Sequence, residues 1–324
     1  MLDRYLRFHW PIIGSPVKFS SNLCNSIKGY IIICPLTPKQ MLRDPGLARK
    51  KIYLSAKFAE QLGAEVIGLG AFTSILTHDG KDLLGKIRCN ITTGNTYAAV
   101  LAVQYIIWIV RIAGIDVKDI KVGIIGAAGS VGSGCAKFLA PKVKKLILID
   151  INLKALEFLT QELKGDLIRS NDVSKVKEAD FIVTATNTPG AVLMPQHISA
   201  GSVIIDASQP KNVSDEIIRK RQDALVISSG IAEIEGVNYD FDLGLRKNEV
   251  FACLGELLMY SSLGIKKDFL GKVESSDMEL VLNYAQRVGF SPARFRNSER
   301  FLSESEIKIF TEEHLIKRLK HCDD

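Results

Sequence analysis

The segment Gly126-Ala-Ala-Gly-Ser-Val-Gly132 decides the fold, because a predicted strand over 121–126 leads into it and a predicted helix over 130–139 follows it. Glycines in such a turn let the backbone bend tightly and approach a pyrophosphate, whose charge is stabilised by the N-terminal N–H groups of the helix. The spacing is G-x-x-G-x-x-G, and three glycines alone can mark nothing more than a turn. Their place between strand and helix favours a dinucleotide site. Its candidate residues are Gly126, Ala128, Gly129, Ser130, Val131 and Gly132.

Short apolar runs and helical segments alternate strictly from residue 120 onward. The predicted strands are 121–126, 145–150, 180–186, 202–207 and 224–228, and the predicted helices are 130–139 and 153–163. Apolar strands that alternate with helices are typical of a parallel sheet covered on both faces. The predicted fold class is therefore α/β: a Rossmann-type doubly wound parallel sheet plus an N-terminal α/β lobe that is completed by C-terminal helices.

The rest of the chain is organised around this unit. Predicted elements outside it are a strand at 29–34, a helical stretch at 38–63 with a break near 44–46, a strand at 65–70, and helices at 98–113, 251–263 and 277–288. We expect an N-terminal substrate lobe over 1–117, a dinucleotide-binding domain over 118–247, and C-terminal helices over 248–324 that pack back on the first lobe, with a tail from about 291. In the tail, Ser303 and Glu306 have the spacing of a capping box.

Asp150 ends the second predicted strand of the Rossmann unit. A carboxylate there can accept hydrogen bonds from the ribose hydroxyls of NAD and would repel the 2′-phosphate of NADP, so the sequence favours NAD(H) over NADP(H). A plain surface aspartate is the alternative. Thr186 and Asn187 stand at the end of another predicted strand, where ligands of parallel sheets bind. We expect them to border the nicotinamide ribose, unless they form only a turn before Pro189.

Composition and charge argue against several other classes of protein. The net charge of +6 is spread along the chain, whereas nucleic-acid-binding proteins concentrate their basic residues. The six cysteines show no paired spacing, so we expect neither disulfides nor a metal site, and free thiols indicate a reducing, cytoplasmic location. The longest apolar segment, 98–113, is shorter than the roughly 20 residues that a membrane span needs.

Several segments, in order, resemble the long-chain acyl–acyl-carrier-protein reductases of cyanobacteria, which form fatty aldehydes. The resembling stretches are 68–75 (Gly-Leu-Gly-Ala-Phe-Thr-Ser-Ile), 92–96 (Thr-Thr-Gly-Asn-Thr), 126–133, 179–183 (Ala-Asp-Phe-Ile-Val), 203–212 (Val-Ile-Ile-Asp-Ala-Ser-Gln-Pro-Lys-Asn) and 251–256 (Phe-Ala-Cys-Leu-Gly-Glu). They extend over about residues 28 to 290, so the resemblance covers most of the chain.

The resemblance implies an acyl-thioester reductase whose nucleophilic cysteine maps to Cys253. A thiolate there would attack an acyl thioester carried by acyl carrier protein or coenzyme A, and the reduced nicotinamide would convert the acyl-enzyme to an aldehyde. Judged from the residues alone, a cysteine in an apolar helix is more commonly a small buried side chain. Arg246, Lys247 and the helix N-terminus are candidates for lowering the pKa of the thiol.

Two other resembling segments supply candidates for substrate or oxyanion contacts. The candidates are Phe72, Thr73, Ser74, Thr93, Gly94 and Asn95. The first three follow a predicted strand and either line the cleft or form only a turn. The last three lead into a helix, whose N-terminal amides can hold an oxyanion or the nicotinamide amide, with ordinary helix capping as the alternative.

Two features depart from the cyanobacterial pattern. Asp150 stands where that family has an Arg-containing segment suited to NADPH, and the tail after about residue 291 has no recognised counterpart. The alternative function is an NAD-dependent dehydrogenase of an amino acid, hydroxy acid or other small polar substrate, and a non-catalytic dinucleotide sensor is a third reading. A long apolar tunnel to the Cys253 sulfur would favour acyl chains, whereas a small basic pocket would favour a carboxylate substrate.

Overall fold

The computed structural model describes residues 8–188, 190–208 and 210–321, so Pro189, Gln209 and Cys322 lie outside the described residues. The chain forms two compact units. The first consists of Met1–Gly94, Ala232–Gly271 and Val281–Ser291, and the second of Asn95–Ile231, Lys272–Leu280 and Pro292–Asp324. The long apolar helix after Gly94 therefore belongs to the second unit, whereas the expected boundary at 117 assigns it to the N-terminal lobe.

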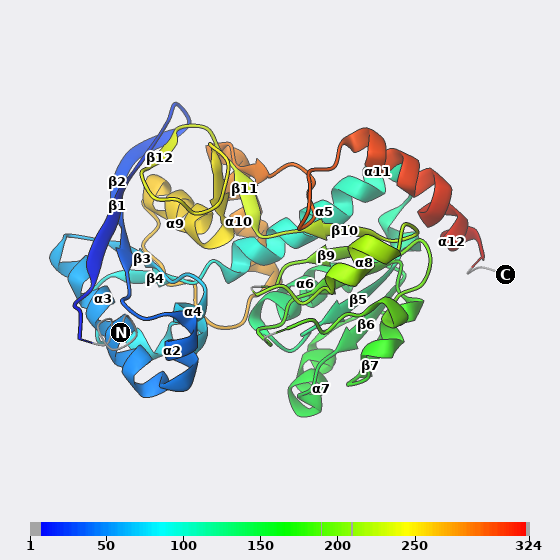
Figure 1. The fold of residues 1–324 in the computed structure, drawn as a ribbon, viewed down its shortest axis with the longest axis horizontal. Coiled ribbons are helices and arrows are strands. Elements are labelled where there is room, and N and C mark those ends of the chain that lie inside the picture. The colour runs from blue at the N-terminus through cyan, green and yellow to red at the C-terminus, as the bar shows by residue number, and fades with distance from the viewer. Residues whose placement is uncertain (1–7, 189, 209, 322–324) are drawn as a thin grey trace. The chain divides into compact units, whose positions relative to one another are not determined.

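A six-stranded parallel sheet is the centre of the second unit (Figure 1). Its strands are β5 (Lys121–Ile125), β6 (Lys145–Ile149), β7 (Leu167–Ser170), β8 (Phe181–Thr184), β9 (Val203–Asp206) and β10 (Leu225–Ser228). They lie in the order β10-β9-β8-β5-β6-β7, and each neighbouring pair is parallel. Counted from β7, this is the 3-2-1-4-5-6 order of Rossmann folds. The predicted fold class is confirmed.

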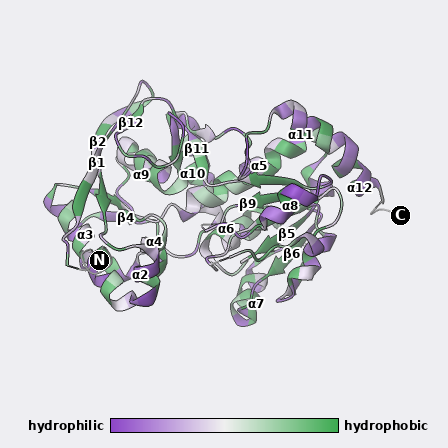
Figure 2. Cartoon of the chain, in the orientation of Figure 1, coloured by the Kyte–Doolittle hydropathy of each residue, from purple (hydrophilic) through white to green (hydrophobic). Residues whose placement is uncertain are grey.

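The sheet is buried as a doubly covered sheet must be. Every residue of β8 and β9 is buried, and so are the last four residues of β5 and of β6. Figure 2 shows β5, β6 and β9 as mainly hydrophobic. The α-helices and 3-10 turns around this sheet are α5 (Asn95–Ala113), η2 (Val117–Asp119), α6 (Ser130–Leu139), α7 (Leu153–Glu162), η3 (Val173–Glu178), η4 (Pro195–His197) and α8 (Asp215–Lys220).

Helix α5 is long and apolar enough to cross a membrane by length and composition, but most of it is buried inside the protein. It packs against α6 and β9 of the same unit, and Tyr105 donates its hydroxyl hydrogen to the carbonyl oxygen of Ala293 at 2.7 Å. A core helix of a protein passes the same hydropathy test. The burial of α5 therefore accounts for its apolar sequence.

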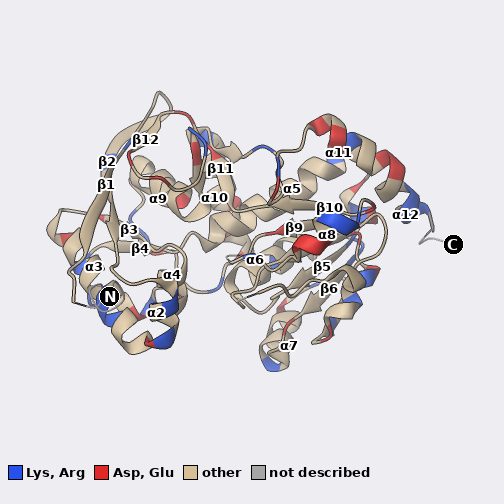
Figure 3. Ribbon diagram, viewed as in Figure 1, with Lys and Arg blue, Asp and Glu red and all other residues tan. Residues whose placement is uncertain are grey.

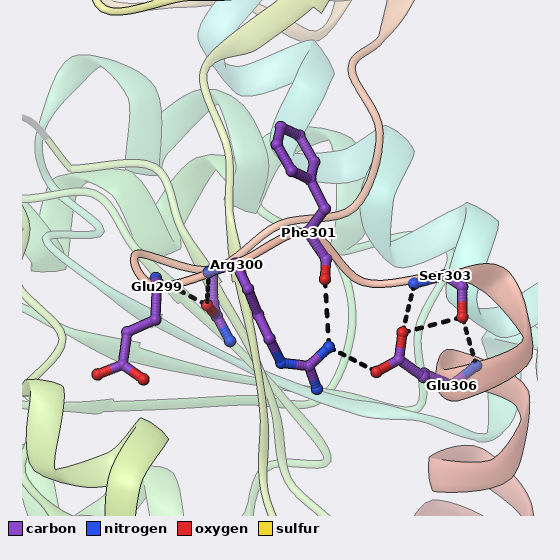
Figure 4. A network of polar contacts seen from close by, with 6 residues as sticks. Glu299, Arg300, Phe301, Ser303 and Glu306 are labelled. Atoms are coloured by element: carbon purple, nitrogen blue, oxygen red, sulfur yellow. Dashed lines mark hydrogen bonds and ion pairs between the residues drawn. The ribbon is translucent and has the colours of Figure 1, made fainter.

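The C-terminal tail is folded and belongs to the second unit. It contains α11 (Glu304–Phe310), the π-turn η5 (Thr311–Leu315) and α12 (Ile316–His321). The predicted capping box is confirmed: the N–H of Glu306 donates to Ser303 Oγ at 3.2 Å, and the N–H of Ser303 donates to Glu306 Oε2 at 2.8 Å (Figure 4). These bonds and Arg300 lower the pKa of Glu306 to about 2. At the far end, Arg318 pairs with the buried Asp180 at 2.8 Å and fixes α12 to the start of β8.

The first unit is built from smaller sheets and the helices around them. Its strands and helices are β1 (Ile12–Ser21), β2 (Cys24–Ile33), α2 (Pro38–Arg43), α3 (Pro45–Gln61), β3 (Val66–Gly68), α4 (Phe72–Leu76), η1 (Lys81–Leu83), β4 (Asn90–Thr92), β12 (Val237–Tyr239), β13 (Glu249–Phe251) and α9 (Ala252–Leu263); β11 (Ile231–Glu233), α10 (Ser275–Val288) and β14 (Ser291–Pro292) continue into the second unit. The order of one sheet is β12-β1-β2, and β3 pairs with β4 in parallel. Helix α9 packs against β2 and β3.

Sequence signals for helix starts act as expected in this unit. Asp44 ends α2 and caps α3, because its carboxylate accepts the N–H of Leu47 at 3.1 Å. The expected break near 44–46 is confirmed. In the second unit, α8 and α11 carry acidic residues in their first turn and basic residues in their last turn, as the red and blue segments of Figure 3 show.

Candidate functional site

The glycine turn after β5 has the close packing that a dinucleotide site requires. Gly126 has φ +83°, and its N–H and that of Ala127 donate to the carbonyl oxygen of Ile149 at 2.8 and 3.1 Å. A Cβ on Gly132 would overlap the Gly126 carbonyl oxygen and lie 2.8 Å from its carbon. Only glycine lets α6 begin so near the turn. Gly129 caps α6 without a side chain, so no capping group competes with a phosphate at its N-terminal amides.

Asp150 fastens this turn to the end of β6. One of its carboxylate oxygens accepts the N–H of Ala128 at 2.9 Å, and the other accepts the N–H of Asn152 at 2.9 Å. Each carboxylate oxygen has a second lone pair with which it can accept a further hydrogen bond. Asp150 therefore holds the turn and keeps acceptor capacity for a ribose hydroxyl. Ser130 and Val131 form the first turn of α6, where the phosphate of a dinucleotide would lie.

A polar network holds the loop that follows β8. Thr186 donates its N–H to Ser208 Oγ at 3.2 Å, and its hydroxyl bonds to the side-chain oxygen of Asn212. Asn212 is fully buried and donates to the carbonyl oxygens of Thr188 and Gly190 at 2.8 and 3.0 Å. Asn187 is exposed. The two predicted residues therefore differ: hydrogen bonds of the network hold Thr186 in place, whereas the side chain of Asn187 is exposed next to it.

Asp206 completes this edge of the sheet at the end of β9. Its carboxylate accepts the Thr184 hydroxyl at 2.6 Å and the N–H of Ser208 at 3.1 Å. Burial raises the pKa of Asp206 even though these hydrogen bonds act in the opposite direction. Neither Asp206 nor Asn212 was singled out from the sequence. Both lie in the 203–212 stretch, where an acid and an amide follow an apolar strand.

One residue of the second predicted group, Gly94, lies directly against Cys253 in the first unit. Cys253 is the second residue of α9 and is half-buried. A Cβ on Gly94 would lie 2.6 Å from the Cβ of Cys253, and a Cβ on Gly70 would touch its sulfur at 3.4 Å. Gly94 has φ +73°, a conformation that favours glycine. Gly70 and Gly94, from two loops distant in sequence, thus place backbone without side chains against the first turn of α9.

Burial and helix position act in opposite directions on the Cys253 thiol. Burial raises its pKa to about 11, and the charge of Glu256 contributes in the same direction. The N–H groups of Leu254 and Cys253, at the start of α9, lower it. Among the described residues, the groups that shift this pKa do not include Arg246 or Lys247. The helix N-terminus lowers the pKa, but burial outweighs it, and a pKa of about 11 keeps the thiol protonated near neutral pH.

The other predicted residues of this unit have local partners. The N–H of Gly94 donates to Glu256 at 3.1 Å, and Thr93 is buried beside it. The expected loop at 72–74 is the helix α4, in which Thr73 donates to the Gly70 carbonyl oxygen at 2.7 Å and Ser74 to Asp79 at 3.5 Å.

Two more placements complete the predicted set. Phe72 packs against the apolar cluster of Leu36, Met41 and Ala48. Asn95 begins α5 in the second unit.

Ala71, between Gly70 and α4, has φ +49° and ψ −130°. A non-glycine residue in such a conformation costs about 1–3 kcal/mol and is found most often at functional sites. The strain lies one residue from Gly70, where an added Cβ would lie 3.4 Å from the Cys253 sulfur.

Residues 109–228 match the family described as shikimate / quinate 5-dehydrogenase. This match covers the glycine turn, Asp150 and the polar network after β8. With the strand order of the sheet, it defines the class of the protein: an oxidoreductase with an NAD(P)-binding Rossmann domain.

The similarity to one relative extends over most of the chain. The long-chain acyl-[acyl-carrier-protein] reductase of Synechococcus elongatus is 28% identical over 307 residues, covering 87% of this chain and 87% of that protein. Aminotransferase PigE of a Serratia species is 23% identical over 287 residues, which cover 84% of this chain but 33% of PigE. Among solved structures, the nucleotide-binding domain of glutamyl-tRNA reductase from Thermoplasma volcanium is 20% identical with a TM-score of 0.30, covering 39% of this chain and 84% of that one. The resemblance to acyl-carrier-protein reductases is thus supported along nearly the whole sequence.

Proposed function

We propose that this protein reduces an acyl thioester, a long-chain acyl carrier protein or acyl-CoA, to an aldehyde through a thioacyl-enzyme on Cys253. The observation that carries the proposal is the setting of Cys253: a half-buried thiol at a helix N-terminus, approached by the bare backbone of Gly70 and Gly94. The similarity of 28% to a long-chain acyl-[acyl-carrier-protein] reductase supports it.

In the first step, Cys253 Sγ bonds to the carbonyl carbon of the thioester, and the bond from that carbon to the carrier sulfur breaks. Because the pKa of the thiol is raised to about 11, the thiol proton is lost as the sulfur attacks, and it passes to the departing carrier thiolate. The N–H groups at the start of α9 stabilise the charge that develops on the sulfur. The carrier thiol gains the proton that Cys253 loses, so acylation needs no external base.

A reduced nicotinamide, when bound, would supply the hydride that reduces the acyl carbon in the second step. Cys253 would then leave as a thiolate and take up a proton as the aldehyde is released. The turn from Gly126 to Gly132 would hold the pyrophosphate, and Asp150 would accept a ribose hydroxyl. Asn212 would keep the loop at Thr186 and Asn187 in place beside the second ribose.

The first experiment separates acylation from reduction. Purified protein is incubated with palmitoyl-CoA without a nicotinamide cofactor and weighed intact by mass spectrometry, with an iodoacetamide-treated sample as control. A palmitoyl adduct that hydroxylamine removes, and that yields hexadecanal when NADH or NADPH is added, supports the proposal. Cofactor binding without adduct or aldehyde, for acyl-CoA and acyl carrier protein of every chain length, overturns it in favour of a dehydrogenase of a small polar substrate.

We further propose that NAD(H) is preferred over NADP(H), because Asp150 would repel a 2′-phosphate. Asp150→Asn is expected to reduce the ratio of the NADPH Kd to the NADH Kd by about tenfold, which is about 1.4 kcal/mol. The amide can still accept one backbone N–H, so the turn keeps part of its support. Fluorescence titration of both cofactors measures the ratio, and Asp166→Asn, which alters a surface ion pair with Lys145, is the control. An unchanged ratio in Asp150→Asn would contradict the assignment.

A further inference from the structure

Glu256 is a fully buried carboxyl group one helical turn after Cys253. Its Oε1 atom accepts the N–H of Gly94 at 3.1 Å and also bonds to the hydroxyl of Thr92. Thr92 is itself completely buried at the end of β4. A buried carboxyl group is unfavourable unless hydrogen bonds compensate for its lost hydration. Both identified bonds join α9 to the segment from Thr92 to Gly94, hereafter the clamp loop.

The clamp loop is where the backbone comes nearest to the nucleophile. A Cβ on Gly94 would lie 2.6 Å from the Cβ and 2.7 Å from the nitrogen of Cys253. Any side chain at position 94 would therefore clash with Cys253, because the atoms it would meet are backbone and Cβ atoms that cannot rotate away. Glu256 therefore hydrogen-bonds to Gly94, the residue that lies against Cys253, and to Thr92, two residues before it.

We propose that Glu256 is a positioning residue, which fastens the clamp loop to the first turn of α9 and so sets the position of the Cys253 sulfur for attack on the acyl group. This inference rests on the proposed function of Cys253. The role needs an acceptor oxygen rather than a charge, because both identified partners present hydrogen-bond donors. The negative charge has a separate effect, since it raises the pKa of the Cys253 thiol.

These two effects are separable by substitution. Glu256→Gln keeps an oxygen that can accept the N–H of Gly94, but it removes the charge. Glu256→Ala removes both. Glu249→Gln is the matched control, because Glu249 is also buried in the first unit and accepts a backbone N–H, from Arg246 at 3.1 Å.

The experiment has two readouts on each full-length variant. The first is the rate constant and the half-saturating concentration for acylation by palmitoyl-CoA, measured by quenched intact-mass spectrometry. The second is the rate of iodoacetamide alkylation of Cys253 from pH 7 to 11, followed on the Cys253 peptide so that other cysteines do not contribute. Thermal melting of each variant reports whether it is folded.

We expect Glu256→Ala to acylate about 100-fold more slowly with little change in half-saturation, since misplacement by about 1 Å can cost that much. Glu256→Gln should recover most of that rate and be alkylated at lower pH than the wild type, and Glu249→Gln should match the wild type in both readouts. A folded Glu256→Ala variant that is acylated at the wild-type rate would overturn the inference, whatever its alkylation profile, as would a Glu256→Gln variant no faster than Glu256→Ala. If the wild-type protein is not acylated at all, the proposed function fails and the positioning role fails with it, whereas a wild-type protein that is acylated and a Glu256→Ala variant that is not slowed would overturn the positioning role alone.

Discussion

Replacement of Cys253 by serine is expected to lower the rate of aldehyde formation by at least about 10⁴-fold, the size of effect seen when a nucleophile is removed. A serine hydroxyl at this position would have a much higher pKa than a thiol. The backbone N–H donors that lower the pKa of Cys253 cannot accept the proton that a serine hydroxyl would have to lose. Gas chromatography of the aldehyde measures the loss. Cofactor affinity should be unchanged, because the glycine turn and Asp150 belong to the second unit.

Cys89→Ser is the control for this substitution. Cys89 is buried in the same unit, and its thiol donates to the Ala64 carbonyl oxygen at 2.9 Å, a bond that serine can reproduce. We expect this variant to form aldehyde at the wild-type rate. A Cys253→Ser enzyme that keeps more than about a tenth of its turnover would contradict a covalent mechanism, since loss of a true nucleophile is far more severe.

The Rossmann part of the fold could be predicted nearly residue by residue. Predicted helix 130–139 has the observed bounds of α6, and the predicted strands differ from β5, β6, β8, β9 and β10 by one or two residues at their ends. Buried parallel strands are apolar throughout, so their signal is local. The missed strand is β7, Leu167-Ile-Arg-Ser170, in which polar residues fill the second half at the edge of the sheet.

The first unit was harder because its order depends on contacts distant in sequence. Strand β1 was not predicted, since Gly14 and Pro16 interrupt it, yet it pairs with β2 and β12 along the sheet. The bond from Gly94 to Glu256 joins residues 162 positions apart, and no local pattern encodes such a pairing. One signal was available: Glu256 is the single charged residue in the apolar segment 251–263. A lone charge in a core helix requires buried partners.

The position of Cys253 also shows what a resemblance adds to local chemistry. From its sequence context a buried, unreactive cysteine was the simpler interpretation, and the raised pKa of about 11 agrees with burial. Cys135 in α6 is also a buried thiol, and burial raises its pKa to about 12. Cys253 differs from it because the backbone of Gly70 and Gly94, more than 150 residues away in sequence, lies against it. The three-dimensional setting therefore carries the functional argument.

Gly132→Ala is expected to weaken NADH binding by at least about 100-fold, about 2.7 kcal/mol. The added Cβ would overlap the Gly126 carbonyl oxygen and lie 3.0 Å from the Cα of Ala127, and both contacts are backbone. Backbone cannot rotate away as a side chain can, so α6 must move off the turn. The N-terminal amides of α6 would then no longer meet a pyrophosphate bound at Gly126.

Gly134→Ala, two residues further along α6, separates this effect from loss of packing. Its Cβ would lie 2.6 Å from a side-chain atom of Val273, away from the turn. Both substitutions should lower the thermal melting temperature, but Gly134→Ala should bind NADH with an affinity within about threefold of the wild type, because the phosphate-binding amides stay in place. Isothermal titration of the two variants with NADH measures the difference. Equal weakening in both would mean that α6 packing, and not the approach of Gly132 to Gly126, controls the affinity for the dinucleotide.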